Sequence, residues 1–456
     1  MPAAGGKSGG NGLPGLVIAR LAGRRHHGGI MALADQVVAS GTNFLTGIVM
    51  ARSCSQEEFG LYMLCFSIIV FSLDLQTALI SSPYLVYSRR LPRGERAAYL
   101  GNTMIQQFFL VVIMVALLVA AMIVTGYTSV VKAIPADRLA AVLPVLALVV
   151  WPLLLREFIR RVCFAALQMT TALLLDGTVF LGQLTGLLLL AAAGRLSTNT
   201  ALYCIGLACV PACGGWLWSR RHTYGFSPAL LGRDLRRNLS FGKWVFFSGL
   251  LWAASMTLYP WLLAFFHGTA ATGVWGACWG VVAVTNPLLL GIQNYLGPKI
   301  IRAYTRGGRR GLGSYVVRAA LGCGFMLLPL AVLLLFFGGR AVALLYGGEY
   351  GGHAPVVMLL AVYILISAIT FPVSRGLLAM ERARLYFAAN LVPLAVMLGG
   401  GILLVKFFGA AGVAMALVAG SLATAVVMSG LFFSLVGKCE AQVENPASRQ
   451  RDRRAP

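Results

Sequence analysis

The sequence predicts an all-α membrane protein with twelve transmembrane helices, arranged as two six-helix lobes around a central cavity. Composition is the first of three observations behind this prediction. Of the 456 residues, 59% are hydrophobic and 11% are charged, and the mean hydropathy is +0.81, whereas soluble globular proteins carry about 25% charged residues. Second, the apolar runs reach the ~20 residues that a spanning helix needs and exceed the ~10-residue segments of a membrane β-barrel. Third, basic residues alternate between these runs.

Twelve apolar runs are long enough to cross a bilayer. The fourth is the least distinct, because the segment WPLLLREFIRRVCF passes from apolar into charged residues without a break. Prolines inside several runs indicate kinks, which membrane helices tolerate where neighbours satisfy the freed carbonyl groups. The runs occupy residues 30–51, 60–82, 99–125, 139–156, 171–194, 199–219, 241–266, 272–297, 315–338, 355–375, 385–406 and 409–436.

The basic residues between the runs indicate the orientation of the chain. With the N-terminus in the cytoplasm, 31 of the 37 Lys and Arg residues fall in cytoplasmic segments and 6 fall outside. This asymmetry agrees with the excess of Lys and Arg in the cytoplasmic loops of membrane proteins. We therefore expect both termini to be cytoplasmic. The net charge of +23 then reflects topology, and no nucleic-acid partner is expected.

The expected domain boundaries follow the loops between the runs. An N-terminal lobe over residues 29–219 is joined by a cytoplasmic loop, 220–240, to a C-terminal lobe over 241–436. The basic, Gly-rich residues 1–28 and the polar residues 437–456 are expected to be disordered tails. A Ser-Gly pair recurs in the first predicted helix of each half. This weak echo favours a transporter whose two parallel repeats surround a central site.

The first run is unusually polar for a membrane anchor. Its acidic residue, Asp35, is costly in hydrocarbon, and such residues usually face a bundle interior or a wet cavity. The predicted direction of this helix places Asp35 near the cytoplasmic leaflet and Asn43 deeper in the membrane. We interpret the helix as one wall of a polar cavity. Its polar residues are Asp35, Gln36, Ser40, Asn43 and Thr46.

Charged residues of the first half converge at the cytoplasmic depth of Asp35. The acids Asp74 and Asp176 lie in or at the edge of predicted spans, level with the arginines at the end of the fourth span. These arginines are Arg156, Arg160 and Arg161. In one interpretation they form an inward-facing vestibule in which planar guanidinium forks hold the phosphate of an anionic head group. In the other, the arginines are topology markers, and the acids pair with nearby arginines at helix interfaces.

The predicted spans of the second half contain aromatic and amide residues in place of acids. Trp252 and Tyr259 share one stripe of the seventh span, while Trp279 and Asn286 share a stripe of the eighth. Aromatic faces beside amides suit sugar rings, which they bind by stacking and hydrogen bonding. The alternative is that the aromatic residues lie at the membrane interfaces and that the amide binds a neighbouring helix.

The remaining motifs predict no catalysis, metal site or cofactor. The nine cysteines lie mostly in apolar runs, where they behave as small apolar residues. Neither a CxxC pair nor a His/Cys spacing suggests a metal, and the sequence has no GxSxG motif and no Walker loop. The acidic pair Glu57-Glu58 is best explained as negative charge at a helix N-terminus. We therefore do not expect an enzyme.

The segment ALADQVVASGTNFLTGIVMARSCSQEEFGLY resembles the opening of the polysaccharide-export branch of the multidrug/oligosaccharidyl-lipid/polysaccharide (MOP) superfamily. Four further segments also match, and the resemblance covers most of residues 30–436. These segments are PLLLREFIRRVCFA, Tyr-Pro-Trp at 259–261, NPLLLGIQNYLGPK and FFGAAGVAMA.

The resemblance implies a flippase of the bacterial plasma membrane. Such a protein moves a polyprenyl-diphosphate-linked oligosaccharide from the inner to the outer leaflet by alternating access. The cavity charges usual in the family would correspond to Asp35, Asp74 and the three arginines of the fourth span. The resemblance also implies three kinds of partner, namely membrane lipid, a polysaccharide polymerase and chain-length proteins.

Three other functions stay open at this point. A cation-coupled multidrug exporter of the same fold would use Asp35 as its proton or sodium site, because a buried acid can change its charge. The many basic residues at the cytoplasmic mouth disfavour cationic drugs. A membrane-embedded polymerase or ligase would need a large outside loop with catalytic Arg or His, and the predicted outside loops are short. The last is a structural or assembly role.

Overall fold

The computed structural model describes residues 13–127 and 136–444, which are helical nearly throughout. No strand occurs in these two ranges, so the predicted all-α class is confirmed. The elements are α1 (Leu13–Ser53), α2 (Gln56–Gln76), the π-helical turn η1 (Thr77–Ser81), α3 (Ser82–Tyr87), α4 (Arg93–Tyr127), α5 (Ala136–Ala165), α6 (Met169–Ala192), α7 (Thr198–Ser219), α8 (Pro228–Ala283), α9 (Asn286–Tyr346), the 3-10 turn η2 (Gly348–His353), α10 (Ala354–Ala379), α11 (Ala383–Val396), the π-helical turn η3 (Met397–Gly401) and α12 (Ile402–Glu444).

Three of the longest helices change direction at a glycine. Gly268 in α8, Gly308 in α9 and Gly409 in α12 have positive φ values of 82°, 58° and 57°. Glycine adopts this conformation without the steric penalty that a Cβ imposes. Each of these glycines lies at the boundary between two predicted spans. Eight helical stretches of the described chain are long and apolar enough to cross a membrane, which is consistent with a multi-pass membrane protein.

Helical structure extends beyond the predicted membrane segments in three places. α1 begins at Leu13, within the stretch 1–28 that was expected to be a disordered tail. α8 begins at Pro228, inside the expected inter-lobe loop, and α12 continues to Glu444. Hydropathy marks only the apolar part of a helix, whereas the backbone hydrogen bonds continue through polar residues. Residues 1–12 and 445–456 of the two expected tails lie outside the described residues.

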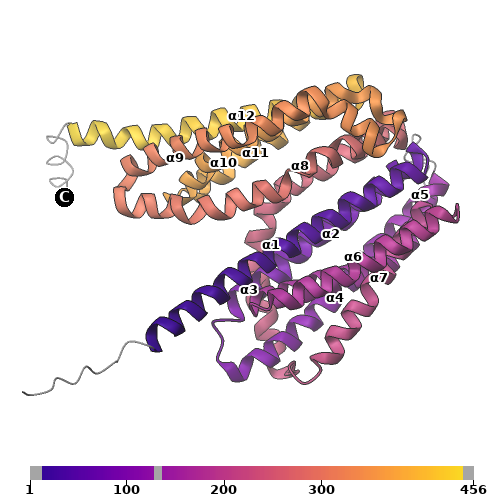
Figure 1. Cartoon of the computed structure of the whole chain (residues 1–456), viewed down its shortest axis with the longest axis horizontal. Coiled ribbons are helices and arrows are strands. Elements are labelled where there is room, and N and C mark those ends of the chain that lie inside the picture. Colours follow the sequence, from indigo (N-terminus) through magenta and orange to yellow (C-terminus); the bar gives the residue numbers. More distant parts are fainter. Residues whose placement is uncertain (1–12, 128–135, 445–456) are drawn as a thin grey trace, which may run out of the picture.

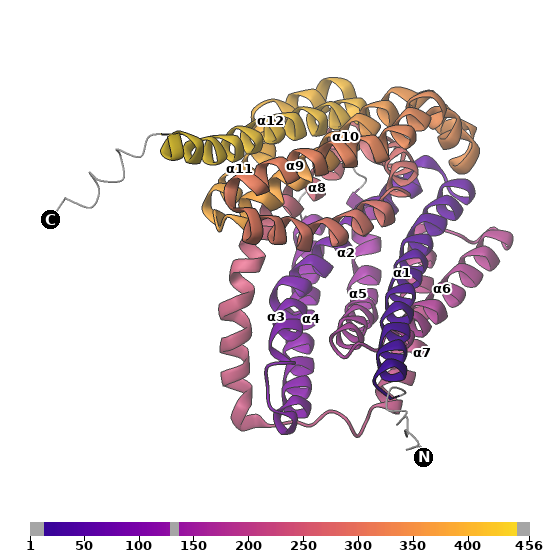
Figure 2. The ribbon, with the colours of Figure 1, turned by 60° about the vertical axis from the view of Figure 1, so that its left-hand side comes forward.

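The helices form two groups that diverge from a shared end (Figure 1). The first group contains α1 to α7, and the second contains α9 to α12 together with the later part of α8. The first turns of α8 lie beside α3 and α4 (Figure 2), so α8 connects the two groups. We call the shared end, which holds the α1–α2 and α9–α10 connections, the closed end. At the opposite open end, α1 begins and α12 ends (Figure 1).

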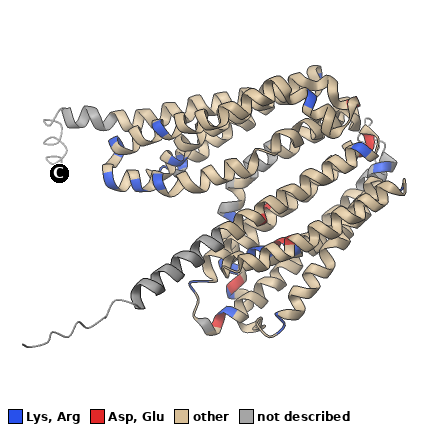
Figure 3. Ribbon diagram, viewed as in Figure 1, with Lys and Arg blue, Asp and Glu red and all other residues tan. Residues whose placement is uncertain are grey.

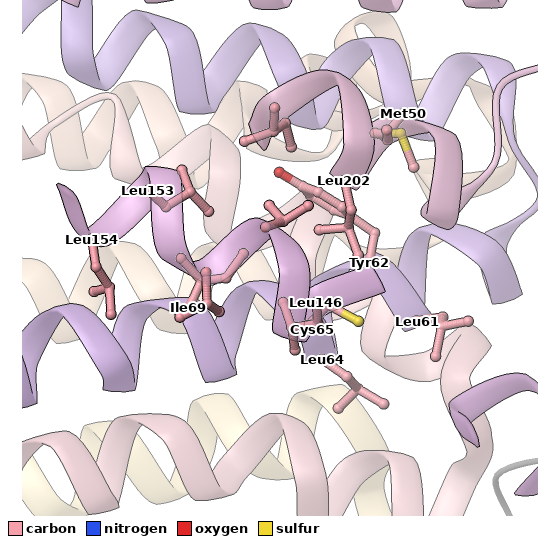
Figure 4. Close-up of a cluster of buried hydrophobic side chains, with 14 of the residues drawn as sticks. Met50, Leu61, Tyr62, Leu64, Cys65, Ile69, Leu146, Leu153, Leu154 and Leu202 are labelled. Atoms are coloured by element: carbon pink, nitrogen blue, oxygen red, sulfur yellow. The ribbon is translucent and has the colours of Figure 1, made fainter. Parts of the chain in front are cut away.

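Apolar packing fills the interior of the first group. Figure 4 shows side chains of α2, α5 and α7 meeting in this core. Leu64, Leu154 and Leu202 are 1% exposed or less. Because lipid tails are as apolar as these side chains, van der Waals packing, more than hydrophobic burial, holds such helices together.

The two groups meet closely where α2 crosses α8 at the closed end. A Cβ atom added to Gly60 would lie 1.7 Å from the carbonyl oxygen of Thr269. One added to Gly273 would lie 2.5 Å from the carbonyl oxygen of Gln56. Small residues allow the backbones of membrane helices to approach this closely. These two glycines therefore set the distance between the groups.

An aromatic cluster and one arginine complete the closed end. The ring centroid of Phe59 lies 6.2 Å from those of Tyr346 and Tyr350, within the range of attractive aromatic pairs. Arg52 donates to the carbonyl oxygen of Leu345 at 2.8 Å. That oxygen belongs to the last turn of α9, where carbonyl groups lack intrahelical partners. Only non-covalent contacts of this kind hold the described part of the closed end.

Cys54 lies in the short connection between α1 and α2. Its Sγ donates to the carbonyl oxygen of Leu196 at 3.5 Å. Burial and the nearby Glu58 carboxylate raise the pKa of the Cys54 thiol to about 11. The thiol therefore stays protonated at neutral pH and is a poor nucleophile.

A buried polar network attaches the first turns of α8 to α4. Asn102 donates to Asp234 at 2.8 Å, and the Tyr99 hydroxyl donates to Asn238 at 2.7 Å. Asn238 in turn donates to Gln106 at 2.8 Å. All five residues are buried. Because an unpaired buried polar group is destabilising, this network fixes the start of α8 to the first group.

Asp234→Ala is expected to destabilise the protein by about 1–3 kcal/mol, since it leaves the Asn102 amide buried without its partner. Glu95→Ala is the matched control. Both acids bind Arg233, but the Glu95 side chain is 39% exposed, so its loss should cost under ~1 kcal/mol. Thermal unfolding of the purified protein in detergent measures the difference. Equal losses of stability would contradict the structural role of the network.

Candidate substrate-binding site

Three helices of the first group bring together four charged residues that the sequence singled out. Arg160 of α5 donates through Nε and Nη2 to Oδ2 of Asp35 on α1, at 3.1 and 2.7 Å. Its Nε also lies 2.8 Å from Oδ2 of Asp176 on α6. Arg156 donates through Nε and Nη2 to Oδ1 of Asp176, at 3.0 and 2.8 Å. The four side chains form one ion-pair network that joins α1, α5 and α6.

Glu157 completes this network, although the sequence analysis did not single it out. Its Oε1 lies 2.6 Å from Nε of Arg161, and its Oε2 lies 3.6 Å from Nη1 of Arg160. Three carboxylates therefore balance three guanidinium groups. The spacing of Glu157 from Arg160 and Arg161, by three and four positions, was the sequence signal for these contacts.

The network is largely enclosed by the first group. Asp35 is fully buried, Asp176 is 2% exposed and Arg160 is 8% exposed. The side chain of Arg161 is the most accessible, at 33%. Asp74 of α2 is half-buried outside the network, within electrostatic range of Arg161. In this conformation Arg156 and Arg160 are paired with acidic residues of the first group.

A second set of predicted residues lines a cavity of about 370 Å³ between the two groups. We call this cavity the central pocket. Asn43 of α1, Trp279 of α8 and Asn286 of α9 all lie on its wall. Phe59 and Tyr346 of the aromatic cluster also line it, so the pocket borders the closed end. The described lining is Val37, Ser40, Gly41, Asn43, Phe44, Gly47, Phe59, Tyr62, Met63, Phe66, Gly276, Trp279, Gly280, Ala283, Val284, Asn286, Pro287 and Tyr346.

A break in the helix presents Asn286 to the central pocket. α8 ends at Ala283 and α9 begins at Asn286. The hydroxyl of Thr285 donates to the carbonyl oxygen of Val282 at 2.8 Å and so satisfies part of the broken backbone. Pro287 fits the first turn of a helix because its missing N–H has no partner there. Discontinuous helices of this kind form the binding sites of many transporters.

The chemistry of the central pocket suits a polar, uncharged ring. Asn43 and Asn286 are exposed within it, and amides can both donate and accept hydrogen bonds. Trp279, stacked on Trp275 with centroids 5.7 Å apart, offers a fixed indole face. The described lining contains no Asp, Glu, Lys or Arg. This part of the cavity therefore offers groups for stacking and hydrogen bonding.

A further cavity of about 390 Å³ lies within the second group, and we call it the C-terminal pocket. Tyr259 lines it, together with Gln293 and Tyr363. The ring of Tyr363 lies 6.3 Å from that of Trp279, so the two pockets are neighbours. The side chain of Trp252 lies outside the described residues.

The structure thus places the predicted site residues in three neighbourhoods. All the predicted charged residues except Asp74 lie in the ion-pair network, the amides and Trp279 in the central pocket, and Tyr259 in the C-terminal pocket. The sequence analysis missed Glu157, although its spacing from Arg160 and Arg161 was a signal, and it missed Tyr363, because the place of Tyr363 depends on which helices cross. Among the described residues, no cluster of His, Cys, Asp and Glu could hold a metal ion.

Comparisons with known proteins agree with this architecture. A model of the polysaccharide biosynthesis protein family matches residues 27–303, more than half of the chain. A search of the curated proteins finds no match.

Solved structures of MOP-type transporters share the fold. An inward-facing multidrug resistance MATE family transporter of the MOP superfamily superposes with a TM-score of 0.73 at 16% identity, over 90% of this chain and 99% of that chain. The lipid II flippase MurJ in an inward closed conformation gives 0.68 at 13% identity, over 89% and 87%. An outward-facing MATE structure gives 0.58 at 16%, over 90% and 95%. The chain therefore belongs to the polysaccharide biosynthesis protein family and has the fold of the MOP superfamily transporters.

Proposed function

We propose that this protein is a flippase that moves a polyprenyl-diphosphate-linked oligosaccharide across the bacterial inner membrane by alternating access. The observation that carries the proposal is the central pocket. It lies between the two groups of helices, and it presents amides and an indole face without charge. Membership of the polysaccharide biosynthesis protein family supports a glycan as the part of the substrate bound there.

The arrangement of the two groups supports loading from the open end. The aromatic cluster and the Gly60–Thr269 contact close one end, while the groups diverge toward the other. The TM-score is higher with the inward-facing MATE structure than with the outward-facing one. We therefore assign the open end and both termini to the cytoplasm, with twelve spans in two six-helix lobes. Release outside would require the closed-end contacts to separate.

Basic residues explain how the anionic lipid would reach this end. Several Lys and Arg residues lie along the ribbon at the open end of the second group (Figure 3). A surface of one charge sign raises the local concentration of oppositely charged ligands. The diphosphate would thus dock at the mouth while the sugars enter the central pocket. A polysaccharide polymerase and chain-length proteins stay predicted partners downstream of this step.

A cation-coupled drug exporter is the less well supported alternative. Asp35 is fully buried and pairs with Arg160 through Oδ2, which leaves the carboxylate poorly placed to bind an external cation. The described linings of both pockets contain neither Asp nor Glu. An unpaired cation in such a buried, weakly polar cavity would carry a large desolvation penalty.

Deleting the gene is expected to abolish surface polysaccharide and to make the lipid-linked oligosaccharide accumulate in the inner leaflet. The double variant Asn43→Leu/Asn286→Leu should restore export about tenfold or more less well than wild type, since each amide provides a hydrogen bond of ~1 kcal/mol or more. Asn294→Leu, an exposed amide of the same helix outside the pocket, is the matched control. Export is read from extracted lipid-linked oligosaccharide at equal protein levels. Loss of drug resistance with intact polysaccharide would contradict the proposal.

A further inference from the structure

The C-terminal pocket has no role in the ion-pair network and is separate from the central pocket. It is enclosed by the later part of α8 and by α9 to α12, and its volume is about 390 Å³. This value lies in the lower part of the ~300–1,000 Å³ range of small-molecule sites. It suits one part of a large ligand, not the whole of it. The residues that carry the argument are Tyr259, Gln293, Tyr363, Thr370, Asn390 and Thr424.

Hydroxyl groups along two helices leave acceptors facing this pocket. Thr370 and Ser374 of α10 donate to carbonyl oxygens of their own helix, each at 2.7 Å. Ser421 and Thr424 of α12 do the same at 2.9 and 2.7 Å. A hydroxyl that has donated its one hydrogen retains its acceptor lone pairs. Asn390 likewise donates one amide hydrogen to the carbonyl oxygen of Tyr386 at 2.8 Å, and its side-chain oxygen remains an acceptor.

The hydrogen-bond donors and the charge of the pocket further limit the class of ligand that it can bind. Gln293 offers amide hydrogens, and Arg375 is an exposed residue of the lining, with its guanidinium 5.0 Å from the ring of Phe371. Arg375 is the one charged residue in the described lining. A positive charge without a partner acid disfavours a cationic ligand. Many acceptors with a few donors suit a ligand that carries several hydroxyl groups.

Aromatic rings connect this pocket to the central one. Tyr259 and Tyr363 provide flat faces in the C-terminal pocket, and sugar rings stack on such faces. Tyr363 lies 6.3 Å from Trp279 of the central pocket. The same stripe of α8 and α9 contributes Asn286 to one pocket and Gln293 to the other. A chain of sugars lying in the central pocket would therefore continue into the C-terminal pocket.

We infer that the C-terminal pocket binds a neutral, hydroxyl-rich sugar of the transported glycan, and that it selects which oligosaccharide is carried. The inference rests on the proposed flippase function and specifies which pocket recognises the glycan. The lipid diphosphate, common to all such substrates, binds elsewhere. Hydrogen bonds to sugar hydroxyl groups can select a ligand effectively. A ligand that lacks a matching hydroxyl leaves a buried polar group of the pocket unpaired, and this weakens its binding.

Binding measurements on the full-length protein in lipid nanodiscs test this inference. The two probes are undecaprenyl diphosphate without sugar and the lipid-linked oligosaccharide that accumulates in cells lacking the gene. Thr370→Val and Thr424→Val remove the hydroxyls while keeping the side-chain shape. The Kd for the oligosaccharide should rise about tenfold for the pair, the loss of one or two hydrogen bonds. The Kd for undecaprenyl diphosphate should not change.

Two controls keep the outcome clear. Thr178→Val makes the same change on α6, where the hydroxyl also donates to its own helix, and should bind both probes as wild type does. Thr424→Ser keeps the hydroxyl that Thr424→Val removes and should bind the oligosaccharide as wild type does. This result would separate the loss of a hydrogen bond from misfolding. Valine variants that bind the oligosaccharide normally, or that lose both probes equally, would overturn the inference. A wild-type protein that binds neither probe would instead overturn the proposed function.

Discussion

Replacing Arg160 with alanine is expected to destabilise the first group of helices by roughly 3–5 kcal/mol, the cost of breaking a buried ion pair by removing one partner. Arg160 is 8% exposed and contacts Asp35, Asp176 and Glu157. Its loss leaves Asp35, which is fully buried, without the guanidinium that binds it. Thermal unfolding in detergent and the level of protein in the membrane measure the effect.

Arg161→Ala is the control for this prediction. Arg161 pairs with Glu157, but the Arg161 side chain is 33% exposed and Glu157 keeps its contact with Arg160, so the loss should be under ~1 kcal/mol. A stable Arg160→Ala protein would show that the network does not support the fold.

The double variant Asp35→Leu/Arg160→Met separates the two interpretations of the network. It removes one charge of each sign and leaves the pairs Arg156–Asp176 and Arg161–Glu157 in place. Replacing a buried ion pair by apolar residues of similar size is often neutral or stabilising, so the fold should recover. If the folded double variant exports polysaccharide normally, the pair is structural. If it folds and fails to export, the pair belongs to the transport path.

Gly60→Val is expected to have the second large effect, because it places side-chain atoms where α2 meets the backbone of α8. The added Cβ would lie 1.7 Å from the carbonyl oxygen of Thr269. Neither backbone can move without separating the two groups. Overpacking costs typically ~1–3 kcal/mol and occasionally more. We therefore expect the closed end to open, with loss of export.

Labelling of a cysteine in the central pocket reports this opening. In an Asn43→Cys background, a membrane-impermeant maleimide added from outside should react much faster when Gly60→Val is also present. Gly322→Val is the matched control, since a Cβ at Gly322 meets nothing within 4 Å. Labelling that is the same with and without Gly60→Val would show that the α2–α8 contact does not seal this end.

Part of the candidate site could be predicted from the sequence. A carboxylate in hydrocarbon must find a polar partner, so Asp35 and Asp176 were predicted to face a bundle interior or a cavity, and the structure places both inside the first group. Asn43, Trp279 and Asn286 were singled out as polar or aromatic residues on helical stripes, and the structure groups them around one cavity. Whether these residues bind substrate stays a prediction.

The remaining contacts could not be predicted, because they join helices far apart in the chain. Nothing local pairs Arg160 with Asp35, 125 positions away. The acceptors of the C-terminal pocket belong to hydroxyl residues whose own-helix hydrogen bonds satisfy them locally. A hydropathy pattern treats such residues as tolerated polar positions and cannot show that they surround one space.

By itself, the sequence determined that this protein is helical and lies in a membrane. The length of an apolar segment and the placement of basic residues beside it are local properties, and they decide whether and in which direction a segment crosses the bilayer. The tertiary structure decided which polar side chains neutralise each other and which remain available in a pocket. It also decided which glycines are required for the close packing of the two groups. Of the 53 glycines, Gly60 and Gly273 limit the approach of the two groups, since only the crossing of α2 and α8 brings another backbone within reach of a Cβ there.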